Sequence, residues 1–327
     1  MASFWKKITL RKKIVSFLLC LIFLFFVIWL ALPNLVEWEL KSQSEDFGFS
    51  GFEVDVEQVD PWLSRLTGLR MEKEASLSLG IDHADVFYSP GSLAEGKIDA
   101  ISLTGLSLEL SGDSPLLSSS ESKETETESL EATLAPFLEQ PSLTHLRVRD
   151  SVLSLTKNGT RYPVEFLLQG DFYPELIRLV FDGSFLGCLF ESHFNLEQNE
   201  SGTFATARMK IPDMAKLQPP LEKVSSAEGF APDGFSLLGG ELKLSASGKV
   251  KENSLTDLFL ELNASDLALD LFGHEANASK IFCFLAPESM DMTNWQAKAY
   301  ANADIRDWCR LFGVELGLRA KGGQFEL

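Results

Sequence analysis

The sequence contains few of the residues that build catalytic or metal centres. Among its 327 residues are four histidines, His83, His145, His193 and His274, and they stand far apart. The chain lacks the HExxH spacing of zinc proteases, the glycine-rich loops of nucleotide-binding folds and the G-x-S-x-G turn of serine hydrolases. Its many carboxylates form no pair that stands out from an acidic surface. We therefore expect no enzyme activity, no cofactor and no metal.

Cysteine is too sparse to form a disulfide framework. Cys20 falls inside a long apolar run, which leaves Cys188, Cys283 and Cys309, an odd number without a CxxC pair. A Cys283–Cys309 bridge stays open as an alternative. However, Cys283 is flanked by two phenylalanines, a pattern typical of a buried core, where a free thiol behaves as a small hydrophobic group.

Acidic residues are absent from positions 1–32, which hold the longest apolar run of the chain. Five basic residues precede 19 consecutive uncharged residues at positions 14–32. A helix of that length spans about 28 Å at 1.5 Å per residue, close to a bilayer core of roughly 30 Å. We predict a transmembrane helix with the basic tail, residues 1–13, in the cytoplasm. The anchor would present Ile14, Phe17, Leu21, Phe25, Ile28 and Leu32 to the membrane.

A cleaved signal peptide is the alternative to this anchor. The apolar run is longer than the usual secretory one, and residues 30–33 form a poor cleavage site, so we favour the uncleaved helix. All 47 acidic residues and 24 of the 29 basic ones follow the run. Such an acidic domain repels nucleic acid, and we expect no nucleic-acid partner.

Beyond the anchor, apolar residues recur mainly with the period of two that strands require. The prediction is a mainly β fold: a first β segment at 33–110, begun by a helical stretch at 34–44, and a β domain at 130–327. Between them, residues 111–129 are small, polar or acidic, which predicts a disordered loop. Short helices are predicted near 130–138 and within 212–224.

Turn residues divide the second segment into hairpins. Asn158-Gly159 between alternating runs is a strong hairpin signal. We also predict turns at 150–151, 182–183, 199–202 and 251–254. Within 97–110 the apolar phase slips between Ala100 and Ile101 and again at Gly105-Leu106, which predicts two bulges or bends.

The clearest alternation lies between residues 241 and 271, where one face is almost purely leucine. Either this face packs against a covering layer, or it lines an apolar groove. Few helical segments are predicted after residue 140 to cover it, which favours the groove. The candidate lining residues are Leu242, Leu244, Leu258, Leu260, Leu262, Leu267, Leu269 and Leu271.

The order of these features resembles the AsmA-like superfamily of exported bacterial proteins. The resemblance is carried by the basic tail and anchor, the GF-x-V-x-V strand at 51–56, Trp62-Leu63, KIDAISLTGLSLEL at 97–110 and LTHLRVRDSVLSL at 143–155. The segment from SGKVKENSLTDLFLEL to SKIFCFL is similar to the YdbH type within it, whose characteristic region is called a dicarboxylate-transport domain. The resemblance covers most of residues 5–327.

The resemblance implies a bridge-like protein held in the bacterial inner membrane, with its bulk in the periplasm. Such proteins fold as a long, curled antiparallel β-sheet around an apolar groove and are thought to conduct phospholipids towards the outer membrane. The implied partners are phospholipid, the inner membrane and an outer-membrane or periplasmic protein at the far end. Because a strand is predicted at 324–327 with nothing after it, we expect a partner to cover it or the chain to be the amino-terminal part of a longer protein.

Two other functions fit the same sequence. A structural or assembly protein of the cell envelope would have a packed β interior and protein partners. A secreted-side eukaryotic glycoprotein would carry glycans at sequons such as those of Asn158 and Asn263.

Overall fold

The computed structural model describes residues 23, 31–46, 48–73, 77–111, 138, 141–157, 160–199, 202–220, 235–251, 254–271, 274–287, 295–303 and 323–326. Nearly all of the predicted anchor at 14–32 lies outside these ranges, as does the predicted loop at 111–129 apart from Ser111. Within the described ranges, no helix is both long and apolar enough to cross a membrane.

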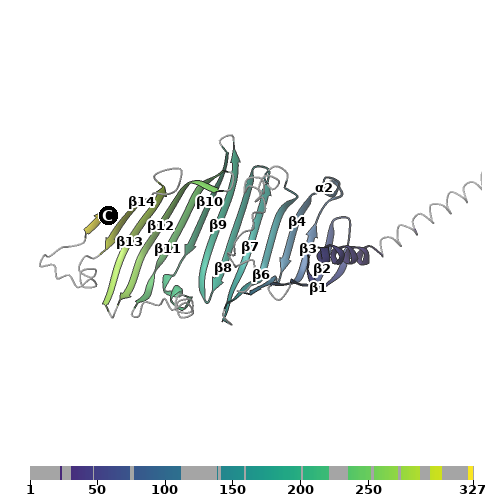
Figure 1. Ribbon diagram of the computed structural model, residues 1–327, viewed down its shortest axis with the longest axis horizontal. Helices are drawn as coiled ribbons and strands as arrows, with labels where there is room; N and C mark the ends of the chain where they lie inside the picture. Colours follow the sequence, from purple (N-terminus) through teal and green to yellow (C-terminus); the bar gives the residue numbers. More distant parts are fainter. Residues whose placement is uncertain are drawn as a thin grey trace, which may run out of the picture.

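Strands dominate the described residues, which confirms a mainly β fold with a few short helices. Fifteen strands in these ranges form one sheet (Figure 1). The strands are β1 (Ser50–Val59), β2 (Leu63–Lys73), β3 (Leu77–Phe87), β4 (Ile98–Thr104), β5 (Ser107–Ser111), β6 (Leu143–Lys157), β7 (Thr160–Tyr173), β8 (Leu176–Phe185), β9 (Cys188–Asn199), β10 (Gly202–Ile211), β11 (Phe235–Lys251), β12 (Ser254–Leu271), β13 (His274–Pro287), β14 (Trp295–Ala303) and β15 (Gly323–Glu326).

Short helices accompany the sheet. Residues 31–46 form a helix that includes the predicted stretch at 34–44, and it lies at the β1–β3 end of the sheet (Figure 1). The α-helix α2 (Pro90–Ala94) follows β3, and the 3₁₀ helix η2 (Met214–Leu217) follows β10. η2 confirms the helix predicted within 212–224. Of the helix predicted near 130–138 only Leu138 is described, and it is helical and buried.

Each strand pairs with the next along the chain from β6 to β15, as expected of a series of hairpins. The sheet is nevertheless mixed, so the prediction of a wholly antiparallel sheet is wrong. β6 runs parallel to both β4 and β5, which together fill one place between β3 and β6. Residues 112–142 separate β5 from β6, and a connection of that length can return the chain to start a parallel strand.

The break between β4 and β5 lies beside a bulge in the neighbouring strand β6. The predicted break at Gly105-Leu106 separates β4 from β5, with Gly105 at φ 70°. The predicted slip at Ala100-Ile101 is absent, because β4 pairs regularly with β3 and β6 there. The turn predicted at 150–151 is instead a bulge inside β6, where Asp150 has φ 50°. The Ser151 hydroxyl accepts a hydrogen bond from the Leu106 amide and donates one to the Arg149 carbonyl.

Three of the five predicted turns are confirmed, and a second one, besides that at 150–151, is wrong. Strands pair directly across residues 158–159, 200–201 and 252–253. Residues 182–183, in contrast, lie inside β8, which turns only at Leu186 and Gly187. Gly183 provides room for a ring, since a Cβ there would lie 2.5 Å from Phe190 Cζ. Close packing between strands, not a turn, explains this glycine.

Candidate apolar groove

A nearly continuous apolar row crosses the sheet from its first strand to its fourteenth. In the strand register, each residue of the row lies directly opposite the next one on the neighbouring strand, so all of them share one face. At about 4.8 Å between strands, the row is roughly 58 Å long. Only Ser192 within it is polar. The row comprises Val56, Leu66, Ala84, Leu103, Val148, Leu168, Phe181, Ser192, Met209, Leu244, Leu262, Cys283 and Ala299.

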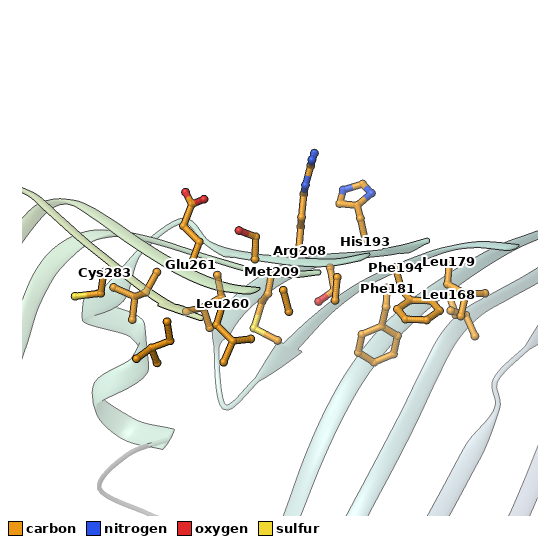
Figure 2. Close-up of a pocket in the computed structure, with 17 residues that line it drawn as sticks. Leu168, Leu179, Phe181, His193, Phe194, Arg208, Met209, Leu260, Glu261 and Cys283 are labelled. Atoms are coloured by element: carbon orange, nitrogen blue, oxygen red, sulfur yellow. The ribbon is translucent and has the colours of Figure 1, made fainter. Parts of the chain in front are cut away.

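The row passes through a cavity of about 710 Å³ in the middle of the sheet. Its walls come from β7–β13, and Figure 2 shows Phe181, Met209 and Leu260 projecting from one side of the sheet. The charged or polar side chains of His193, Arg208 and Glu261 project from the opposite side. The residues around the cavity are Leu168, Leu179, Phe181, Ser192, His193, Phe194, Ala207, Arg208, Met209, Leu244, Ser245, Ala246, Leu260, Glu261, Leu262, Cys283 and Leu285.

Two short segments cover the apolar face on either side of this cavity. After β10, η2 places Met214 in a buried cluster with Leu237 and Leu267. At the other edge of the sheet, Leu138 is buried against Ile177 and Leu196. The amide of Glu175, in the β7–β8 turn, donates a hydrogen bond of 2.8 Å to the Leu138 carbonyl. Among the described residues, the apolar face is therefore covered near both edges and holds the cavity between them.

Of the eight leucines predicted to line a groove, six separate into two groups. Leu244, Leu260 and Leu262 line the cavity. Leu267 belongs to the buried cluster under η2, and Leu242 and Leu269 pack against that cluster. Leu258 is half-buried on β12 and is not part of the cavity wall. Leu271 ends β12, and its side chain lies outside the described part.

A bulge in β12 lies between the two groups, and η2 covers only the second of them. Asp266 has φ 51°, and the opposing Gly240 has φ 117°; a Cβ on Gly240 would lie 2.9 Å from Leu267 Cα. The bulge shifts the apolar phase of β12 by one residue between Ala264 and Leu267, so that both stay on the same face. The carboxyl half of β12 then runs beneath η2.

Other cavity residues were not singled out from the sequence. Phe181, Phe194 and Met209 come from β8–β10, where they show the same period-two alternation as the leucines. That alternation is a signal for a shared face, but only the strand register places them beside Leu244. Cys283 was expected in a buried core. It is a half-buried free thiol on the cavity wall.

The opposite face of the sheet carries charge. Lys210 Nζ lies 3.2 Å from Glu241 Oε2, and Lys243 also contacts this carboxylate. Hydrogen bonds from Lys243 and Lys210 lower the pKa of Glu241 below its usual value.

Burial raises the pKa of the Cys188 thiol, and the negative charge of Asp213 adds to the effect. The described ranges hold no group of three or more histidine, cysteine or acidic side chains that could bind a metal.

The arrangement can hold an extended apolar ligand, and the charged side chains of Arg208 and Glu261, among the described lining residues, point away from the apolar side of the sheet (Figure 2). Comparison with known proteins adds no relative to this description: no family model, no curated protein and no solved structure matches the chain.

Proposed function

We propose that this protein shields the acyl chains of phospholipids in an apolar groove on one face of its sheet. The observation that carries the proposal is the in-register row from Val56 to Ala299. A packed sandwich would bury such a row under a second layer. Here a cavity of about 710 Å³ lies along the part of the row from Leu168 to Cys283, whereas Val56, Ala84 and Val148 in its first part are buried.

The energetic need for such a surface is large. Exposing one methylene to water costs about 0.8 kcal/mol, so one 16-carbon chain costs on the order of 12 kcal/mol. The apolar wall of the cavity removes most of that cost for the part of an acyl chain that it contacts. It requires no reacting group, which suits a site with apolar walls.

The bulges support a curled sheet, the shape expected of an AsmA-like bridge. Non-glycine residues with positive φ lie within β6 and twice within β12, at Asp150, Asp257 and Asp266. Bulges bend a strand and increase its twist. With the predicted anchor at 14–32, the protein would sit in the bacterial inner membrane, its sheet in the periplasm, and pass lipid between the inner and outer membranes.

Photo-crosslinking from β12 tests this proposal. A photoreactive amino acid at Leu260, in full-length protein in living cells, should give a lipid adduct identified by mass spectrometry. The matched control is the adjacent Glu261, which projects from the opposite face (Figure 2). Equal adduct yields at the two positions, or no lipid at either with crosslinking confirmed elsewhere, would count against the groove.

A structural or assembly protein of the envelope is the second candidate. The buried cluster of Met214, Leu237 and Leu267 favours it, because part of the apolar face is filled as in an ordinary core. In that case the same photoreactive group at Leu260 should capture a protein of one discrete mass instead of lipid.

A further inference from the structure

A single hydroxyl group lies in the apolar wall of the cavity. Ser192 on β9 is the only polar member of the apolar row, and it lies opposite Phe181 on β8 and Met209 on β10. Phe190 and Phe194, two residues before and after it on β9, share its face of the sheet. Apolar side chains therefore flank Ser192 on all four sides in the plane of the sheet.

This hydroxyl makes no hydrogen bond to any residue that the structure describes. Ser192 is half-buried, and no buried side-chain nitrogen or oxygen in the described ranges lacks a partner, so its oxygen is still accessible from the cavity. The four neighbouring side chains cannot satisfy it, because phenylalanine has no acceptor and the methionine sulfur is a weak one.

A ligand that fills the cavity changes the energetics of this hydroxyl. The ligand displaces water, and a hydroxyl left without a partner in apolar surroundings is costly. A plain hydrocarbon segment lying over Ser192 would leave the hydroxyl unpaired, whereas an acceptor oxygen on the ligand would satisfy it. The cavity therefore favours a ligand that is apolar except at this one point.

The charges around the cavity decide which kind of oxygen fits. The charged side chains among the described lining residues, Arg208 and Glu261, project from the opposite side of the sheet (Figure 2). The carboxylate of a free fatty acid would therefore bury an unpaired charge beside Ser192. The carbonyl of an acyl ester accepts a hydrogen bond without carrying a charge.

We propose that Ser192 donates a hydrogen bond to the ester carbonyl of an acyl lipid and thereby fixes where in the cavity the acyl chain begins. The proposal rests on the proposed function and narrows its ligand to acyl esters. Ser192 is then a specificity-determining residue, and the leucines around it supply the apolar contact.

The position of Ser192 also gives the chain a direction. The cavity walls run from β7 to β13, so two strand spacings lie on one side of β9 and four on the other. At about 4.8 Å between strands, these distances are roughly 10 Å and 19 Å. The hydrocarbon of one leaflet, half of a bilayer core, is about 15 Å thick. A whole acyl chain therefore fits only on the longer side, towards Cys283 on β13.

Competition between an ester lipid and its ether analogue tests the hydrogen bond. Full-length protein with a photoreactive amino acid at Leu260 is placed in nanodiscs of equal amounts of a diacyl phosphatidylcholine and its dialkyl ether analogue, which lacks the carbonyls. Mass spectrometry should find about five- to tenfold more ester adduct than ether adduct. Ser192→Ala, which keeps the small size, should make the two yields equal. Ser192→Thr, which keeps the hydroxyl, should retain the ester excess.

Ser245→Ala is the matched control, because Ser245 lies opposite Arg208 and therefore on the other face of the sheet. It should leave the ester excess unchanged. Equal yields of the two lipids in the parent protein, or an ester excess that survives Ser192→Ala, would overturn the role of Ser192 and leave the groove standing. Capture of neither lipid at Leu260, with crosslinking confirmed elsewhere, would refute the proposed function and this proposal together.

A lipid with a photoreactive group at the end of its acyl chain tests the direction. In the parent protein, peptide mapping should place several-fold more adduct on Cys283 and Leu285 of β13 than on Leu168 of β7. Ser192→Ala should reduce this difference, because the chain then loses its fixed starting point. Equal adducts on β13 and β7 in the parent protein would overturn the direction.

Discussion

The two halves of β12 carry the same leucine alternation in different surroundings. Leu260 and Leu262, in the amino half, line the open cavity. Leu267 and Leu269, in the carboxyl half, lie in or against the cluster closed by η2. The bulge at Asp266 separates the halves but keeps both sets of leucines on one face. An alternating pattern therefore specifies a face of the sheet and leaves open whether that face is covered.

The covered half shows how this chain builds a core when it needs one. Immediately after β10, η2 supplies Met214 and Leu217 to fill the space over Leu237, Ala264 and Leu267. Among the described residues, no comparable segment packs over Leu244, Leu260 and Leu262. The contrast within one strand supports a groove in the open half more strongly than the apolar composition of the sheet would by itself.

The two halves of β12 should differ most in how much stability the protein loses when one leucine in each half is truncated. Leu267 is 7% exposed, so Leu267→Ala should reduce the free energy of unfolding by about 2–4 kcal/mol through the cavity it leaves. Leu260→Ala should cost about 1 kcal/mol or less, because its side chain already borders open space. Denaturant unfolding of both variants in the same buffer measures the difference. Equal losses would mean that the cavity closes around Leu260 in solution.

The two described cysteines should differ in reactivity for the same reason. Cys283 borders the open cavity, whereas Cys188 is 3% exposed and burial raises its pKa. In a Cys20→Ser, Cys309→Ser background, maleimide should label Cys283 at least about tenfold faster than Cys188, because only the accessible thiolate reacts. As pH rises, labelling of Cys188 should increase at a higher pH than for an ordinary thiol. Similar rates at both sites would contradict an open cavity and a closed core.

Added phospholipid sharpens the same measurement. Lipid in the groove should slow the labelling of Cys283 and leave Cys188 unaffected. If lipid slows both thiols equally, it acts on the whole protein and not on the cavity. Unchanged labelling of Cys283 in saturating lipid would place the ligand elsewhere.

Much of the fold follows from local sequence signals. Alternation and turn residues predict the hairpins on either side of Asn158-Gly159 and the helical turn that follows Pro212. They fail where contacts are distant in sequence. The parallel pairing of β6 with β4 depends on the return of the chain after β5. Asp182-Gly183 has the composition of a turn, but Gly183 lies within β8 and makes room for the ring of Phe190, a contact that the linear sequence does not reveal.

The candidate site was predictable to a similar extent. Leu244, Leu260 and Leu262 stand out because their strands alternate cleanly. Phe181 and Met209 join them only through the register of β8–β11, which no single strand contains. The tight packing of Leu267 depends on η2, which contributes Met214 from outside β12. Coverage of a sheet face is a tertiary property, so the pattern of one strand cannot report it.

The smallest change in stability is expected from a substitution on the face opposite the groove. Lys210 and Lys243 lie directly opposite each other in the register, and Glu241 accepts hydrogen bonds from both. Because these bonds lower the pKa of Glu241, they stabilise the fold above the carboxyl's ordinary pKa. That contribution is lost as pH falls through the lowered value. Glu241→Gln should therefore lower Tm slightly at neutral pH, less so in high salt, and leave Tm unchanged in acid.

Thermal unfolding followed by circular dichroism at several pH values measures this effect, and labelling of Cys283 serves as the control. Since Glu241 belongs to the charged face, Glu241→Gln should leave the labelling rate unchanged. A large loss of Tm, or a changed rate at Cys283, would show that the two faces of β11 are coupled. The groove would then depend on the ionic face as well as on its own apolar row.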